Sequence, residues 1–85
     1  MMTVTNLDVY ASLIEAVKAQ LDVDAHENIK PSDTFKSIGL DSMSTLCVMR
    51  DIESKYSIDI PDEAISIENT LEEATEVIFC LILNK

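Results

Sequence analysis

Glycine and proline are scarce in this sequence, which has one Gly and two Pro among its 85 residues. An all-β domain needs frequent turns, and Gly and Pro supply most of them. The chain is therefore better suited to a few helices joined by loops. Apolar residues make up 47% of it, which favours a folded core over a disordered chain. We expect an all-α fold in one domain over residues 1–85, because this length suffices for one domain and no more.

Apolar residues recur at helical intervals in three stretches of the sequence. The first stretch covers residues 6–21, where Thr5 or Asn6 can cap the helix start. The second begins at Asp41 or Ser42 and ends near residue 56 or 57. The last follows Thr70, which forms a capping-box pattern with the Glu three residues later. The expected core residues are Leu7, Tyr10, Leu13, Ile14, Val17 and Leu21, then Leu46, Met49, Ile52 and Tyr56 with Val48 at their edge, then Leu71, Ala74, Ile78, Leu81 and Ile82.

The connections between these helices are unequal in length. Residues 22–41 show no sustained periodicity, and a connection this long in a small domain often has a function. Apolar residues should pin it to the core: Val23, Ile29, Phe35, Ile38 and Leu40. Pro61 can open a short third helix that ends at Ala64 or Ile65. The sequence thus predicts a small four-helix bundle, with three longer helices, a short third one and a long loop between the first two.

The formal net charge is −10, from 16 acidic and 6 basic residues. A surface this acidic repels phosphate backbones, which argues against nucleic-acid binding and favours partners with basic patches. Residues 1–9 lack the basic and apolar stretches of a signal peptide, and the longest apolar run, residues 77–83, is far too short to span a bilayer. We expect a cytoplasmic protein. Cys47 and Cys80 show no metal or redox spacing, so we expect two reduced thiols and no metal site.

Ser42 lies in the segment Gly39-Leu40-Asp41-Ser42-Met43 at the expected start of the second helix. A hydroxyl there faces solvent beside unpaired N–H groups, and these donors and the helix dipole favour an anion such as a phosphodiester. The alternative is that Ser42 or Asp41 is simply an N-cap. Nucleophilic catalysis has little support, because the sole histidine, His26, falls in the long loop. We therefore expect no catalytic residue.

The same segment resembles the G-x-D-S-[LM] signature of acyl and peptidyl carrier proteins. The similarity extends over roughly residues 7–82. It includes an aromatic residue, Phe35, shortly before the glycine, and a second helix that ends in Tyr56. After that helix, Ile60-Pro61-Asp62-Glu63 matches the I-P-D-E segment of the family. The chain is thus similar to a discrete, stand-alone carrier protein.

The resemblance implies that a phosphopantetheinyl transferase moves 4'-phosphopantetheine from coenzyme A to Ser42. The arm would hold acyl or aminoacyl groups as thioesters and present them to loading, condensing and modifying enzymes, so the chain itself would not be an enzyme. Asp41 would assist the transferase and orient the helix start. Met43 is an apolar residue on the side of the helix expected to face water, and it would be a contact for partner enzymes. Partial packing of Met43 against the loop is the alternative.

The expected partner face of the second helix carries Met43, Cys47, Arg50 and Ser54. Together with Ser44, Asp51 and Lys55, which are expected on the same outer face, its charges nearly cancel, whereas carriers of fatty acid synthesis usually show an acidic face there. Acidity lies downstream instead, with seven acidic and no basic residues between Ser57 and Asn84. This departure favours a polyketide or nonribosomal-peptide pathway. The alternatives are a fatty acid synthesis carrier, a carrier for one activated amino acid, and an unmodified acidic helical adapter.

The last helix carries apolar residues outside its core stripe, namely Val77, Phe79, Cys80 and Leu83. In a thin bundle, a helix end can be covered on several sides, and this interpretation agrees with a monomer. The alternative is a surface for a partner or for self-association.

Overall fold

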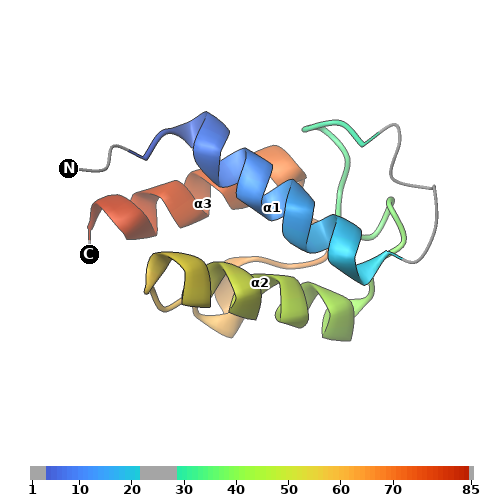
Figure 1. Cartoon of the computed structure of the whole chain (residues 1–85). Helices are drawn as coiled ribbons and strands as arrows, with labels where there is room; N and C mark the ends of the chain where they lie inside the picture. Colours follow the sequence, from blue (N-terminus) through green and yellow to red (C-terminus); the bar gives the residue numbers. More distant parts are fainter. Residues whose placement is uncertain (1–3, 22–28, 85) are drawn as a thin grey trace.

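The computed structural model describes residues 4–21 and 29–84. These residues form three α-helices, α1 (Asn6–Gln20), α2 (Ser42–Tyr56) and α3 (Leu71–Leu83), and one 3-10 helix, η2 (Asp62–Ala64). α1 packs against both α2 and α3 (Figure 1). The prediction of an all-α fold is confirmed for this part of the chain. Val23 and His26, for which the sequence analysis made predictions, lie outside the described residues.

The expected short third helix is a 3-10 helix, so the predicted count of four bundle helices is not confirmed. Pro61 caps a single 3-10 turn of three residues, and the chain is extended again at Ile65. None of the three turn residues is buried, so no apolar stripe is available to support a longer helix. The fold is therefore a bundle of three α-helices with one short 3-10 turn.

Capping residues set where the helices begin. Thr5 caps α1 and Thr70 caps α3, each through a complete capping box with the acidic residue three positions later, Asp8 and Glu73. The α2 helix ends at Ser57, which adopts the left-handed conformation with φ 55°. The sequence-based helix boundaries agree with these ends to within a residue.

The core is apolar and draws on all three α-helices and on the segments that connect them. Phe35, Leu13, Ile52, Leu71, Ile78, Val9, Val17 and Val48 are its largest fully buried side chains. Two predicted core residues are wrong: Leu7 is 79% exposed and Leu46 is 37% exposed. Val9, which was not predicted, and Val48, predicted at the edge of the core, are fully buried, because the buried stripe of each helix is rotated relative to the predicted one.

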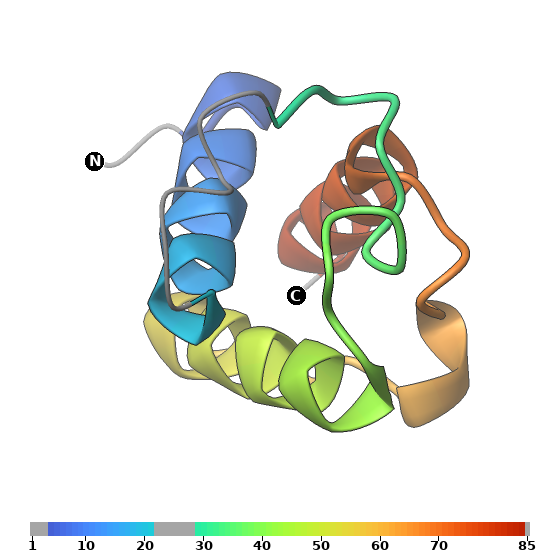
Figure 2. The same ribbon diagram turned by 90° about the vertical axis from the view of Figure 1, so that its right-hand side faces the viewer.

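Residues 29–41 are tied to the beginning of α3, as Figure 2 shows where this segment crosses that helix end. Backbone N–H groups of Leu71 and Glu72 donate to the carbonyls of Asp33 and Pro31 at 2.9 and 3.0 Å. These N–H groups belong to the first turn of α3 and have no partner within the helix. The long connection thus satisfies the start of α3, and Phe35, with no exposed surface, anchors it in the core.

Apolar residues of α3 outside the predicted stripe divide into two groups. Val77 and Phe79 are half-buried and pack against the core, as the covering of a thin bundle requires. Cys80 and Leu83 are exposed, Leu83 by 66%. The exposed apolar surface on which a partner or a second copy could pack is therefore limited to about the last turn of the helix.

Candidate functional site

The site is built where the long connection turns into α2. Gly39 has a φ of +102°, a conformation that side-chain-bearing L-residues rarely adopt. A Cβ at this position would lie 3.8 Å from Leu21 Cδ2, which is an ordinary contact, so the backbone conformation and not crowding requires glycine. Leu40 is buried and its N–H donates to the Phe35 carbonyl at 3.0 Å. This anchored turn fixes the position of the next two residues.

Asp41 is the N-cap of α2. Its Oδ1 accepts a hydrogen bond from the backbone N–H of Ser44 at 2.8 Å. Its carbonyl accepts both the N–H and the hydroxyl of Thr45, at 3.0 and 2.8 Å. The hydrogen bond from Ser44 stabilises the carboxylate and lowers the pKa of Asp41 below its ordinary value of 3.8. Asp41 therefore fixes the helix start, as the N-cap interpretation predicts.

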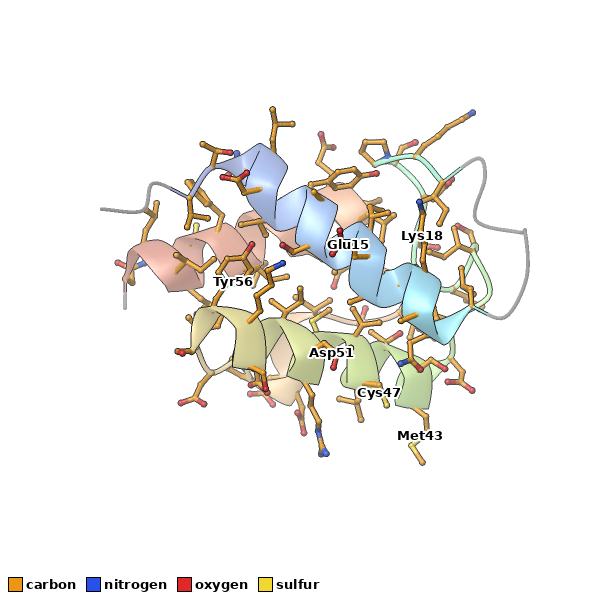
Figure 3. The ribbon with its side chains drawn as sticks, in the orientation of Figure 1. Glu15, Lys18, Met43, Cys47, Asp51 and Tyr56 are labelled. Carbon is orange, nitrogen blue, oxygen red and sulfur yellow. The ribbon has the colours of Figure 1, made fainter. Side chains whose placement is uncertain are left out.

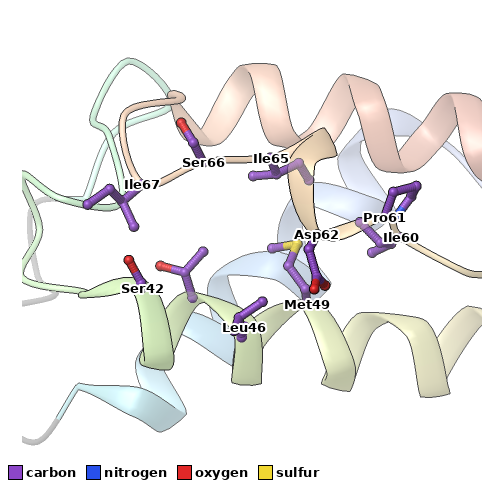
Figure 4. A pocket seen from close by; sticks show the side chains of 10 residues that line it. Ser42, Leu46, Met49, Ile60, Pro61, Asp62, Ile65, Ser66 and Ile67 are labelled. Carbon is purple, nitrogen blue, oxygen red and sulfur yellow. The ribbon is translucent and has the colours of Figure 1, made fainter.

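Ser42 is the first residue of α2 and is exposed. Because Asp41 is the N-cap, the Ser42 hydroxyl does not take part in capping the helix. The side chain points from the start of α2 toward the segment that holds Ser66 and Ile67 (Figure 4). Its hydroxyl is thus displayed at the positive end of the helix, the environment expected for a phosphodiester.

A cavity of about 330 Å³ opens beside Ser42 between α2 and the chain that leads to α3 (Figure 4). One wall is α2, and the other is the segment from Ile60 to Ile67. The lining residues are Ser42, Thr45, Leu46, Met49, Ile60, Pro61, Asp62, Ile65, Ser66 and Ile67. Its volume lies at the lower end of the range of small-molecule sites, and its walls are mostly apolar, as such sites require.

The predicted partner-face residues lie together on the outside of α2. Met43, Cys47, Arg50 and Ser54 are all exposed, and Met43 and Cys47 point away from the other helices (Figure 3). Met43 is 74% exposed, so the alternative in which it packs against the loop is excluded. Ser42 and this face thus belong to the same helix, but Ser42 is turned toward the segment from Ile60 to Ile67, whereas Met43 and Cys47 face outward.

The cavity is the part of the site that sequence reasoning missed. The segment from Ile60 to Glu63 resembles a family motif, but its sequence does not predict a role in the site. Ile65, Ser66 and Ile67 carried no local signal, because only the packing of this segment over α2 places them near Ser42. Within residues 4–21 and 29–84, no three or more His, Cys, Asp and Glu side chains are arranged to hold a metal ion. In the same part of the chain, no helix is long and apolar enough to cross a membrane.

Comparison with known proteins identifies the family. The sequence model of the family described as "Phosphopantetheine attachment site" matches residues 11–78. The chain is 33% identical over 73 residues to an acyl carrier protein of Helicobacter hepaticus, covering 85% of this chain and 95% of that protein. It is 31% identical over 74 residues to an acyl carrier protein of Picosynechococcus, covering 86% and 90%. A chloroplastic acyl carrier protein of Brassica napus is 30% identical over 69 residues, covering 81% and 52%. No solved structure gives a significant match.

The chain therefore belongs to the phosphopantetheine attachment site family. Its prosthetic group is phosphopantetheine, and its role is that of a phosphopantetheine-bearing acyl carrier. This role implies contact with a phosphopantetheinyl transferase and with the enzymes of a biosynthetic pathway.

Proposed function

We propose that the Ser42 hydroxyl is the attachment point of phosphopantetheine and that the chain presents acyl groups on this arm to other enzymes. The observation that carries the proposal is the exposed Ser42 side chain at the first position of α2, next to a largely apolar cavity. When bound, the arm supplies a thiol that holds an acyl group as a thioester. Presentation requires an accessible anchor and a tether that keeps the local concentration of the cargo high.

The chain's own residues have separate tasks at this site. Asp41 holds the first turn of α2 in place, so that the Ser42 hydroxyl faces solvent. The helix N-terminus stabilises the negative charge of a phosphodiester on Ser42. Leu46, Met49 and Ile65 line the cavity beside it and offer apolar surface to the inner part of the arm or its cargo.

We also propose that the chain is not itself an enzyme. The ten residues that line the cavity include one ionisable side chain, Asp62, and none of the His, Cys or Lys side chains that commonly activate a serine. Asp41 is adjacent to Ser42, but its carboxylate is engaged by the Ser44 N–H. Transfer of the cargo is accordingly assigned to the partner enzymes.

The proposal also covers the kind of cargo and the pathway. The relatives are named acyl carrier proteins, which supports acyl over aminoacyl cargo and favours fatty acid synthesis. A polyketide or nonribosomal-peptide pathway is the second candidate, and the specific observation that favours it is the exposed Arg50 on an α2 face that is not acidic. We also propose that the protein is cytoplasmic and that residues 1–85 form a single domain. An unmodified adapter is disfavoured by the family match.

The attachment site is tested by mass spectrometry of the intact chain after incubation with coenzyme A, magnesium and a broad-specificity phosphopantetheinyl transferase. We expect one added phosphopantetheine on the wild-type chain and on Ser44→Ala, and none on Ser42→Ala. Ser44 is the matched control, because it lies in the same turn of α2 and keeps its backbone contact to Asp41. Modification of Ser42→Ala, or no modification of the wild type, would contradict the proposal.

The pathway is tested by loading the modified chain with purified activating enzymes. A malonyl transferase of fatty acid synthesis, an acyltransferase of a polyketide pathway and an adenylating enzyme for amino acids are assayed separately, and the loading rate with each enzyme is followed by the mass of the loaded chain. Preferred loading by the first supports fatty acid synthesis. Preferred loading by either of the others supports the second candidate.

A further inference from the structure

The cavity wall opposite α2 ends in a tight turn before α3, formed by residues 66–69. Asn69 closes this turn with both its side chain and its backbone. Its Oδ1 accepts the backbone N–H of Ser66 at 2.7 Å, and its own N–H donates to the Ser66 carbonyl at 3.1 Å. Ser66 lines the cavity, and so do its neighbours Ile65 and Ile67 (Figure 4). Asn69 therefore closes the turn that carries this end of the wall.

Asn69 also ties the turn to two other parts of the fold. Its Nδ2 donates to Glu73 Oε1 at 3.1 Å, the same oxygen that accepts the N–H of Thr70 in the capping box of α3. Its carbonyl accepts a longer hydrogen bond of 3.4 Å from the N–H of Phe35, the buried anchor of the long connection. Both backbone groups and both polar atoms of the amide are thus in hydrogen bonds.

The chemistry of the two side-chain partners calls for an amide at this position. The backbone N–H of Ser66 only donates, and the ionised carboxylate of Glu73 only accepts. Hydrogen bonds, first from the N–H of Thr70 and then from the Asn69 side chain, hold the pKa of Glu73 below its ordinary value of 4.5, so this acceptor is charged at neutral pH. An amide offers an acceptor to one partner and a donor to the other. An aspartate would place a second carboxylate against Glu73.

The part of the wall nearest to Asn69 depends on these hydrogen bonds more than on packing. Ile65 is buried and held by the core, whereas Ser66 is exposed and Ile67 is half-buried. They face α2 across a cavity of about 330 Å³, so packed side chains do not fill the space between them. The Ser42 side chain points toward this same end of the wall (Figure 4). The turn therefore sets the shape of the cavity beside the attachment residue.

Resting on the proposed function, we propose that Asn69 is a positioning residue for the cargo: it holds Ser66 and Ile67 opposite Ser42, so that the cavity receives the acyl chain of the arm. A wall that is fixed before the cargo enters loses little conformational freedom when the cargo binds, and this favours enclosure. The apolar chain gains free energy by leaving water. Asn69 touches neither the arm nor the cargo in this role and acts through the turn.

The test uses the intact chain, loaded by a broad-specificity phosphopantetheinyl transferase with acetyl- or octanoyl-coenzyme A. The transferase joins the phosphate of the acylated arm to the Ser42 hydroxyl and releases adenosine 3',5'-bisphosphate. Hydroxylamine then attacks the thioester carbonyl, the acyl group leaves as a hydroxamic acid, and mass spectrometry follows the return of the free thiol. Each rate is divided by the rate for the same acyl group on free pantetheine. The ratio measures the protection that the protein gives.

We expect the wild type to protect the octanoyl thioester at least about fivefold more than the acetyl thioester, because the longer chain enters the cavity. In Asn69→Ala the two should be protected to within about twofold of each other, since the wall is no longer held in place. The exchange variant Asn69→Asp/Glu73→Gln swaps donor and acceptor in this side-chain pair and should keep the preference of the wild type.

Thr5→Ala is the matched control. It also removes a hydrogen bond at a helix start, but it does so at α1, and Thr5 does not line the cavity. If Asn69 only stabilised the fold, Thr5→Ala and Asn69→Ala would behave alike in this assay. We expect Thr5→Ala to keep the octanoyl protection of the wild type. Circular dichroism confirms that both variants are folded at the temperature of the assay.

The outcomes separate the two proposals. If the wild type is never loaded on Ser42, the proposed function is wrong. If it is loaded but protects both acyl groups equally, or if Asn69→Ala keeps the octanoyl protection, the positioning role of Asn69 is wrong and the proposed function stands. Loss of protection in the exchange variant or in Thr5→Ala would overturn the positioning role in the same way.

Discussion

The Glu53 carboxylate accepts a hydrogen bond from the backbone N–H of Ile60, with 2.7 Å between Oε2 and N. This bond joins the last turns of α2 to the segment that forms the opposite wall of the cavity. It also directs an acidic side chain away from the outward face of α2. One contact therefore supports the cavity wall and keeps an acidic side chain away from the outward face of α2.

We expect Glu53→Ala to lower the free energy of unfolding by about 1–2 kcal/mol, because the half-buried N–H of Ile60 loses a charged acceptor. Glu53→Gln keeps an oxygen in the same place and should lose less than half as much. Urea unfolding monitored by circular dichroism measures both values. Equal losses in the two variants would show that the hydrogen bond is not what stabilises this segment.

A second prediction concerns Phe35, which comes from the long connection and has no exposed surface. Phe35→Ala should cost about 3–5 kcal/mol, because a large buried ring is lost from a thin core. Leu7→Ala is the control, since this side chain is 79% exposed and its removal should change stability by less than about 0.5 kcal/mol. Comparable losses for the two variants would mean that the connection does not anchor the fold.

The third prediction is an acid-dependent loss of stability. A hydrogen bond from the backbone N–H of Ser44 lowers the pKa of Asp41 below 3.8, and one from the backbone N–H of Thr70 lowers the pKa of Glu73 below 4.5. A carboxyl group with a lowered pKa in the folded state stabilises it above the ordinary pKa, and this contribution disappears as pH falls below that value. Asp41→Asn and Glu73→Gln should each flatten the fall of the thermal midpoint between pH 5 and about pH 3. A slope equal to that of the wild type in both variants would contradict these assignments.

The fourth prediction concerns the cavity of about 330 Å³ beside Ser42. If part of the acyl group enters it, each methylene that leaves water raises the free energy of unfolding by about 0.8 kcal/mol. The thermal midpoint of the loaded chain should then rise with acyl length until the cavity is full. Ile67→Trp fills the cavity and should abolish this rise, whereas Glu68→Trp, one residue outside the lining, should preserve it. A midpoint independent of acyl length in the wild type would mean that the cargo stays in solvent.

The sequence alone was sufficient to predict those features that depend on residues close together in the chain. The capping box of Thr70 with Glu73, the N-cap at Asp41 and the exposure of Ser42 all depend on residues within one helical turn of one another. Each could be predicted because the responsible side chains and backbone groups are neighbours in the chain.

The remaining features depend on how segments pack. Leu7 fits the helical period of α1, but the partner helices do not reach it, so it is exposed. Leu46 fits the period of α2 and instead lines the edge of the cavity. The cavity needs Ile65 and Ile67 to lie over α2, a contact between residues about 20 positions apart that no local pattern encodes.

The last prediction concerns the two positions with positive φ within the described residues, Gly39 at 102° and Ser57 at 55°. Gly39→Ala should destabilise the fold by about 1–3 kcal/mol, because alanine disfavours this backbone conformation although its Cβ has room. Ser57→Gly removes a side chain from the left-handed cap of α2 and should instead stabilise it slightly. Since Gly39 positions the turn before Ser42, Gly39→Ala should also slow phosphopantetheine loading, and Ser57→Gly should not. Unfolding free energies and loading rates of both variants test this, and unchanged loading in Gly39→Ala would show that the turn does not position the serine.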